Sequence, residues 1–144
     1  MGSVRRIFWD TMIHAYWLED HKKLSHRVQH IHQEMARCGD TLCSSLFVLG
    51  ELLVGPMRTG DIAATDLIEQ YFYSPAVTLL PHSSKSVRIF AQLRAQQGVK
   101  SLDAIHLAMA AAAGVDLFLT NDHRLQKLVV PGISFIASLD TNLF

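Results

Sequence analysis

Residues 101–122 read SLDAIHLAMAAAAGVDLFLTND and combine a helix, a glycine stop, an apolar strand and a polar end. Ser101 begins the predicted helix over residues 102–113, and Gly114 ends it, because glycine is favoured just past a helix C-terminus. Residues 115–119 form a continuous apolar run, which is typical of a strand buried on both faces of a parallel sheet. The stretch therefore predicts one helix-to-strand unit of an α/β protein.

The rest of the chain repeats this alternation of strands and helices. Strands are predicted over residues 4–9, 41–44, 76–80 and 133–137, and helices over residues 13–18, 20–37, 45–54, 61–73, 83–97 and 123–128. Gly55-Pro56 is expected to stop the helix that Ser45 caps, because proline is unfavourable inside a helix. The alternation predicts one domain, residues 1–144, with a three-layer α/β/α fold around a central parallel sheet.

The composition fits a single domain that works in a reducing compartment. With 144 residues, the chain is long enough to bury one core. The two cysteines, Cys38 and Cys43, are too few and too close in sequence to staple the fold, so a cytoplasmic protein with free thiols is expected. The start of the chain lacks the apolar stretch of a signal peptide, and no run reaches the length of about 18 apolar residues that a membrane span needs.

Hydropathy and charge bear on the partners of the protein. A hydrophobic content of 49% and a mean hydropathy of +0.19 indicate that a partner covers part of the surface, either a second copy or another protein. The formal net charge is zero, but four of the 13 acids belong to the motifs described next, and the 13 basic residues outnumber the other nine. Once metal ions neutralise those four acids, the basic surplus permits nucleic-acid binding.

Four acidic residues stand near the end of a predicted strand or the beginning of a predicted helix. Asp10 and Asp122 each follow a strand, in Phe8-Trp9-Asp10-Thr11 and Leu119-Thr120-Asn121-Asp122. Glu51 lies about two turns into its helix, and Asp103 lies in the first turn of its helix. Ligands of open α/β sheets bind outside the carboxyl ends of the strands, so all four acids can reach one place. An all-oxygen site of this kind suits Mg²⁺ or Mn²⁺.

Each acid also has a purely structural interpretation. Asp122 is a good helix N-cap, Asp103 gains from the dipole of its helix, and Asp10 could be a turn residue at the end of a strand. Glu51 is harder to explain in this way, because apolar residues surround it in sequence and a buried charge is costly unless it is paired or bound to a metal. The coincidence of all four favours the metal site.

The eight histidines suggest a zinc site only at first sight. His26 and His30 stand four residues apart, but a zincin requires His-Glu-x-x-His, and Arg27 occupies the position of the glutamate. These histidines are instead expected to form a solvated helix face, together with three more that are nearby in sequence: His14, His21 and His32.

The chain resembles a PIN domain and, among PIN domains, the VapC-type toxin endoribonucleases. The matching motifs, in the order and spacing of the family, are Asp10-Thr11, Ser45 with Glu51, Asp103-Ala104 with Ala108, and Thr120-Asn121-Asp122. Two positions depart from the family pattern. Met12 stands where an Asn or Ser often follows the first motif, so the support of Asp10 is expected to differ. Leu125 stands where an aromatic residue often follows the last motif.

The resemblance implies a metal-dependent endoribonuclease, a hydrolase that cleaves RNA phosphodiester bonds with a metal-activated water. Asp10 and Asp103 are the first candidates for direct ligands of Mg²⁺ or Mn²⁺, and Glu51 and Asp122 would bind the ion directly or through water. The residues expected to orient ligands or waters are Thr11, Ser45, Thr120 and Asn121. The residues expected to contact phosphates are Arg88, Arg94, Lys100 and Arg124.

The resemblance also implies partners. The protein would be the toxin of a toxin–antitoxin pair, would form a homodimer, and would be inhibited by a small antitoxin protein whose Arg or Lys enters the acidic pocket. The alternative from a different class is a PIN-fold protein-binding module whose pocket holds a partner's basic residue without cleavage. A phosphatase of the haloacid dehalogenase type needs Asp-x-Asp, and Met12 breaks that motif. Intact acids favour the nuclease.

Overall fold

The computed structural model describes residues 4–144, and its centre is a sheet of five parallel strands. In the order β3-β2-β1-β4-β5, the strands are Thr78–Leu79, Thr41–Ser44, Arg6–Trp9, Leu117–Leu119 and Phe135–Ala137. The central strand β1 is apolar after Arg6, with Ile7, Phe8 and Trp9 all 0% exposed. This burial on both faces is the pattern of a parallel sheet and confirms the predicted fold class.

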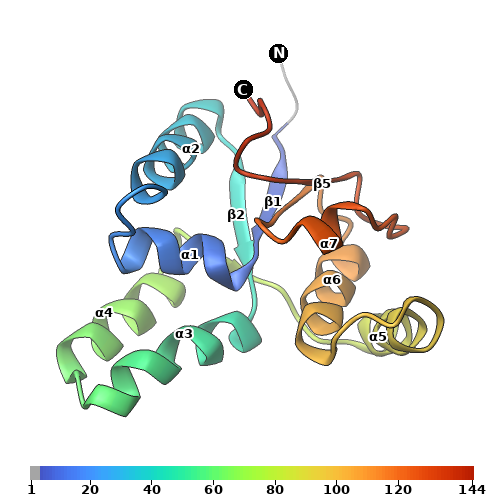
Figure 1. Cartoon of the computed structure of the whole chain (residues 1–144), viewed down its shortest axis with the longest axis horizontal. Helices are drawn as coiled ribbons and strands as arrows, with labels where there is room; N and C mark the ends of the chain where they lie inside the picture. Colours follow the sequence, from blue (N-terminus) through green and yellow to red (C-terminus); the bar gives the residue numbers. More distant parts are fainter. Residues whose placement is uncertain (1–3) are drawn as a thin grey trace.

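Seven helices cover the two faces of the sheet (Figure 1). On one side lie α1 (Thr11–Leu18), α2 (Ser25–Cys38), α3 (Leu46–Thr59) and α4 (Ile62–Phe72). On the other side lie α5 (Ser84–Gln97), α6 (Ser101–Ala113) and α7 (His123–Gln126). The arrangement is a three-layer α/β/α sandwich, and no helix within residues 4–144 is long and apolar enough to span a membrane.

Two predicted helix boundaries were wrong by more than two residues. Helix α3 does not stop at Gly55-Pro56 but continues to Thr59, where Gly60 adopts a left-handed φ of 70°. Packing against α1 and α4 outweighs the local cost of the proline, and the Thr59 hydroxyl donates to the Pro56 carbonyl at 3.2 Å. Helix α2 begins at Ser25 and not at Asp20, because Asp20 has a φ of 50° and interrupts the helix.

Four of the five predicted strands are shorter in the structure, and β2 has the predicted bounds. The order and partners of the strands define the functional end of the sheet. Strand β1 pairs with β2 on one side and with β4 on the other, and Trp9 is in register with Leu119. Strands β2 and β3 are therefore added on one side of β1, and β4 and β5 on the other, so the strand order reverses between β1 and β4. Ligands of open α/β sheets bind at such a switch point, beyond the carboxyl ends of the strands. Asp10 and Thr120 are the first residues beyond these two ends.

Candidate functional site

Asp10 is buried at the end of β1 and is held there by two hydrogen bonds. One carboxylate oxygen accepts the backbone N–H of Thr11 at 2.8 Å, and the other accepts the hydroxyl of Thr120 at 2.8 Å. Thr120 is itself completely buried, and its hydroxyl also accepts the N–H of Asp122 at 3.1 Å. Burial raises the pKa of Asp10 above its ordinary value, although the Thr120 hydrogen bond acts in the opposite direction.

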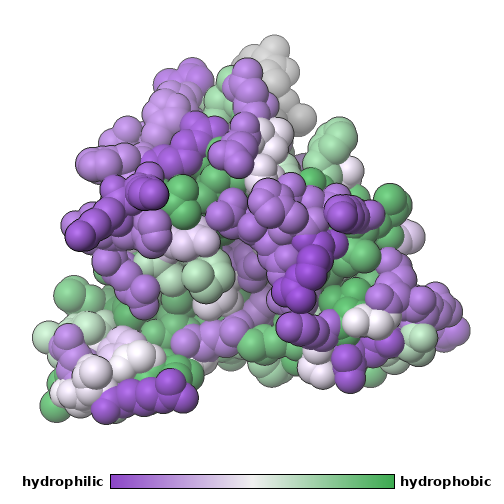
Figure 2. Space-filling view, in the orientation of Figure 1, coloured by the Kyte–Doolittle hydropathy of each residue, from purple (hydrophilic) through white to green (hydrophobic). Residues whose placement is uncertain are grey.

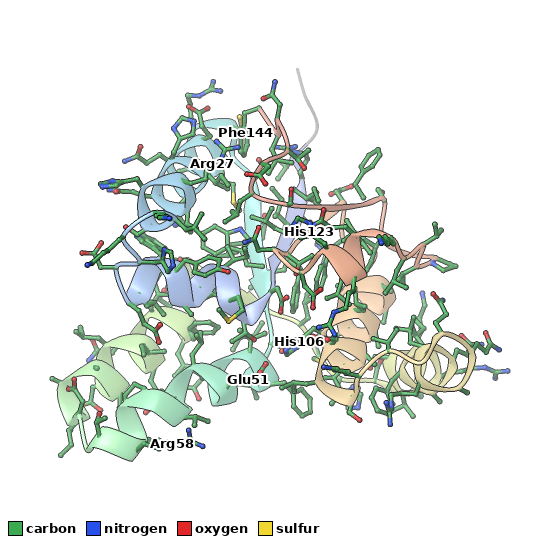
Figure 3. The ribbon with its side chains drawn as sticks, in the orientation of Figure 1. Arg27, Glu51, Arg58, His106, His123 and Phe144 are labelled. Atoms are coloured by element: carbon green, nitrogen blue, oxygen red, sulfur yellow. The ribbon has the colours of Figure 1, made fainter. Side chains whose placement is uncertain are left out.

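Glu51 reaches the same end of the sheet from α3. Ser45 begins this helix by accepting the backbone N–H of Val48 at 3.2 Å, which confirms its predicted role as the N-cap. Atom Oε1 of Glu51 accepts the Thr11 hydroxyl at 2.7 Å and lies 2.5 Å from Nε2 of His106. Figure 3 shows Glu51 and His106 side by side between α3 and α6. Burial acts to raise the pKa of Glu51, but the hydrogen bonds from His106 and Thr11 outweigh it and lower the pKa.

Asp103 projects from the first turn of α6, and its carboxylate makes no hydrogen bond to any residue of the described part of the chain. It does not cap the helix, because the N-cap position belongs to Lys100. Partial burial raises the pKa of Asp103, and repulsion from Asp10 and Asp122 raises it further. Asp103 therefore does not cap α6, but the dipole of α6 favours its charge, as its position in the sequence suggested.

Asp122 does have the structural role that its position in the sequence suggested. Its carboxylate caps α7 by accepting the backbone N–H of Arg124 at 2.9 Å. The Arg124 guanidinium donates to both carboxylate oxygens, at 3.1 and 2.8 Å, and this is the main reason why the pKa of Asp122 is lowered. This structural role is compatible with the predicted role in metal binding, because a carboxylate that caps a helix at the rim of a cavity can still coordinate a metal ion.

The four acids line one cavity of about 250 Å³ at the switch point. Its full lining is Asp10, Thr11, Met12, Tyr16, Glu51, Asp103, His106, Asn121 and Asp122. Within residues 4–144, no three His, Cys, Asp or Glu side chains are close enough together to hold a metal ion as they stand. The acids nevertheless repel one another across the cavity: Glu51 raises the pKa of Asp10, and Asp10 raises that of Asp103. An oxygen-lined cavity with this unbalanced negative charge fits a divalent cation such as Mg²⁺ or Mn²⁺.

The residues predicted to support the acids lie at the cavity, whereas the residues predicted to bind phosphates are scattered. Thr11 and Asn121 line the cavity. The Thr120 hydroxyl donates to Asp10, and Ser45 caps the helix that carries Glu51. Arg124 and Lys100 both lower the pKa of Asp122 and so lie near the rim. The exposed Arg94 donates to the carbonyl of Val99 at 2.9 Å. The exposed Arg88 lies on α5, outside the cavity lining.

Two histidines differ from what the sequence predicted. His106 is a residue of the site that the motif analysis missed, and a sequence signal existed, because His106 lies one turn after Asp103 on the same face of α6. His14 was expected on a solvated helix face but is 1% exposed and packs between the rings of Trp9 and Phe72. His26 and His30 are exposed on α2, which fits the solvated helix face that the sequence predicted for them.

Comparison with known proteins agrees with this fold. A family model for the PIN domain matches residues 7–130. Comparison with the curated proteins gives no match. The structure is similar to that of VapBC2 from Rickettsia felis bound to a DNA fragment from its promoter, with a TM-score of 0.74 and 19% identity over 92% of this chain and 98% of that one. It is also similar to DNA-bound VapBC from Salmonella typhimurium, with a TM-score of 0.68 and 19% identity over 94% and 99% of the two chains.

A toxin–antitoxin complex from Klebsiella pneumoniae has the same fold, with a TM-score of 0.65 and 18% identity over 88% of this chain and 94% of that one. At these identities the structural likeness shows the fold alone. The family model adds a match in sequence, and it spans β1 through α7 and includes all four acids of the cavity. The chain therefore belongs to the PIN domain family.

Proposed function

We propose that this protein is a divalent-metal-dependent endoribonuclease and the toxin of a toxin–antitoxin pair. The observation that carries the proposal is the cavity at the switch point, where four acids from four separate segments face one another. Nothing in the packing of the core requires these acids to meet, and their mutual repulsion costs folding free energy unless a cation offsets it. Family membership supports nuclease chemistry at this place.

The side chains would have different roles in such a site: metal binding, positioning of the ligands and contact with phosphates. Asp10 and Asp103 would hold the ion directly, and Glu51 and Asp122 would hold it directly or through water. The bound ion would supply a Lewis acid that activates water and stabilises negative charge on the phosphate. Thr120 and the N–H of Thr11 keep both oxygens of Asp10 in fixed positions. Arg124 and Lys100 lie near enough to the rim to contact the phosphates of an RNA strand.

Purified protein offers a direct test of this activity. The wild type should cleave RNA in the presence of Mg²⁺ or Mn²⁺ and should lose the activity in chelator, whereas a well-folded Asp103→Asn variant should not cleave under either condition. Variants at the exposed His26 and His30 should cleave as the wild type does. Metal-dependent cleavage that persists in a well-folded Asp103→Asn variant would remove the assignment of this site, whereas a wild type that binds its partner but cleaves no RNA with either metal would favour the protein-binding module.

An antitoxin would approach the site along α1 and α3. A groove of about 350 Å³ runs between α1, α3 and α4, and the apolar residues that line it include Ala15, Leu18, Leu52 and Ile68. The same two helices carry Thr11 and Glu51, so the groove leads toward the acidic cavity. Figure 2 shows hydrophobic colour over α3 and α4. Exposed apolar side chains in this region are Val54, Met57, Ile62 and Leu67.

The contact between Arg124 and Asp122 indicates how a partner could inhibit the enzyme. A guanidinium already pairs with one acid at the rim, so an Arg or Lys from the antitoxin would pair with the remaining acids. Copurification should therefore yield a small second chain that suppresses cleavage, and light scattering of the free toxin should give the mass of a homodimer. A monodisperse monomer at micromolar concentration that retains no second chain would contradict this part of the proposal.

A further inference from the structure

Glu51 is the one acid of the cavity that is held by a histidine. His106 lies on α6, is 1% exposed, and directs Nε2 at Oε1 of Glu51 over a distance of 2.5 Å. The Thr11 hydroxyl donates to the same oxygen at 2.7 Å. Atom Oε1 therefore carries two contacts, and Oε2 has no hydrogen bond to any residue in the described part of the chain.

The hydrogen bonding of His106 is asymmetric. A carboxylate oxygen can only accept, so the proton of the contact must lie on Nε2 of the ring. The other nitrogen, Nδ1, is buried and has no partner among residues 4–144. An unsatisfied buried polar atom costs free energy, and an apolar side chain at this position of α6 would avoid that cost. Packing of the core alone thus gives no reason for a histidine here.

The contact links both sides of the cavity into one chain of hydrogen bonds. His106 on α6 holds Glu51 on α3, and Glu51 accepts from the hydroxyl of Thr11 on α1. The backbone N–H of Thr11 then donates to Asp10 at the end of β1. Glutamate has one more rotatable bond than aspartate, so Glu51 needs such fixed donors to present one oxygen in a defined direction.

We infer that His106 is a positioning residue for metal binding, which fixes Oε1 of Glu51 and leaves Oε2 as the oxygen presented to the cavity. The inference rests on the proposed function, because it assigns His106 to the same metal site. His106 itself donates to the carboxylate and does not take the place of a ligand. Removal of such a supporting hydrogen bond typically weakens metal binding by about 10- to 100-fold.

The test is the dissociation constant of Mn²⁺, measured by electron paramagnetic resonance of the free ion with the full-length protein. His106→Leu removes the donor, whereas His106→Gln keeps an N–H donor at a similar reach. We expect His106→Leu to bind Mn²⁺ about 10- to 100-fold more weakly than wild type. His106→Gln should recover most of that loss, and His14→Leu, the matched change at a buried histidine outside the cavity, should bind as the wild type does.

The outcomes separate the inference from the proposed function. If the wild type binds Mn²⁺ and Asp103→Asn does not, the metal site stands, and equal affinity of His106→Leu and wild type would then overturn only the role of His106. If the wild type itself fails to bind Mn²⁺, both proposals fall. Nitrogen-15 NMR spectra of the wild type report which ring nitrogen of His106 carries the proton, so this measurement does not depend on the folding of a variant. They should show the His106 proton on Nε2, and a proton found only on Nδ1 would overturn the inference.

Discussion

His106 and His14 are equally buried, at 1% exposure each, but the regions around them differ in polarity. His106 meets a carboxylate and a hydroxyl at the acidic cavity. His14 lies in an aromatic cluster, with its ring centroid 5.1 Å from those of both Trp9 and Phe72. Burial, together with the nearby His106 and His32, lowers the pKa of His14 to about 3, so its ring is neutral at physiological pH.

The two regions meet at the end of β1, where the chain changes from an apolar residue to a charged one. Trp9 belongs to the aromatic cluster, and Asp10 belongs to the cavity. In the cluster, burial is complete and charge is excluded. In the cavity, hydrogen bonds from Thr11 and Thr120 accompany the buried carboxylate of Asp10. The comparison suggests that the cluster serves stability and the cavity serves chemistry, and each prediction below tests one side of that division.

Asp10→Asn should have the largest effect on activity. If Asp10 holds the metal ion as proposed, its loss removes several kcal/mol of transition-state stabilisation, so cleavage of RNA should fall by at least about 100-fold. His14→Leu, only four residues away, should retain cleavage because it lies in the aromatic cluster. The rate of RNA cleavage by both folded variants measures this contrast, and comparable losses in the two would break the division between the regions.

Thr120→Val should reduce cleavage while the fold remains intact. The change keeps the shape of the side chain but removes the hydroxyl that donates to Asp10, and such supporting bonds are typically worth about 10- to 100-fold in metal affinity or activity. Thr120→Ser keeps the hydroxyl and is the matched control. Equal rates for the Val and Ser variants would show that the hydroxyl does not position Asp10.

His14 should make the wild type sensitive to acid. Its folded pKa of about 3 lies below the ordinary value of 6.5, so the unfolded chain takes up a proton that the folded protein excludes, and stability is lost as pH falls through this range. Between about pH 7.5 and 5, the free energy of unfolding should fall by about 2 kcal/mol more in wild type than in His14→Leu. Urea denaturation at both pH values measures the difference, with the exposed His30→Leu as a control that keeps the wild-type dependence.

Asp103→Asn should have the smallest effect on stability of these variants and should not destabilise the metal-free protein. The raised pKa of Asp103 means that its charge opposes folding at neutral pH, and removal of the charge relieves repulsion from Asp10 and Asp122. Because the group is partly exposed, water limits the gain to about 1 kcal/mol or less. In thermal melts with chelator, the variant should unfold at or above the temperature of wild type. A clearly lower temperature would mean that Asp103 stabilises α6.

Much of the fold could be predicted because local signals agree with the final packing. Gly114 ends α6 in the structure as the sequence indicated, and Ser45 begins α3. The end of α3 could not be predicted, because packing against neighbouring helices overrides the unfavourable proline. The buried position of His14 was also hidden, since it depends on Phe72, which is distant in sequence.

The candidate site also contains residues that could be predicted from the sequence and residues that could not. The four acids could be found from the sequence because each stands at a strand end or near a helix start, and the order of a parallel sheet brings those points together. The spacing of His106 from Asp103 was a signal in the sequence, but the contact of His106 with Glu51 could not be predicted, because it depends on the distance across two helices. Arg88 lies outside the cavity lining, so its contact with phosphates stays a prediction, since charge alone does not specify where a surface residue lies.

The most direct test of the central claim is thermal unfolding of wild type and Asp103→Asn with and without Mn²⁺. If the acidic cavity is a metal site, Mn²⁺ at about 100 times its dissociation constant should stabilise the wild type by about 2.7 kcal/mol. Asp103→Asn should gain much less under the same conditions, because one ligand is missing. Equal stabilisation of the two proteins, or none in the wild type, would contradict the account.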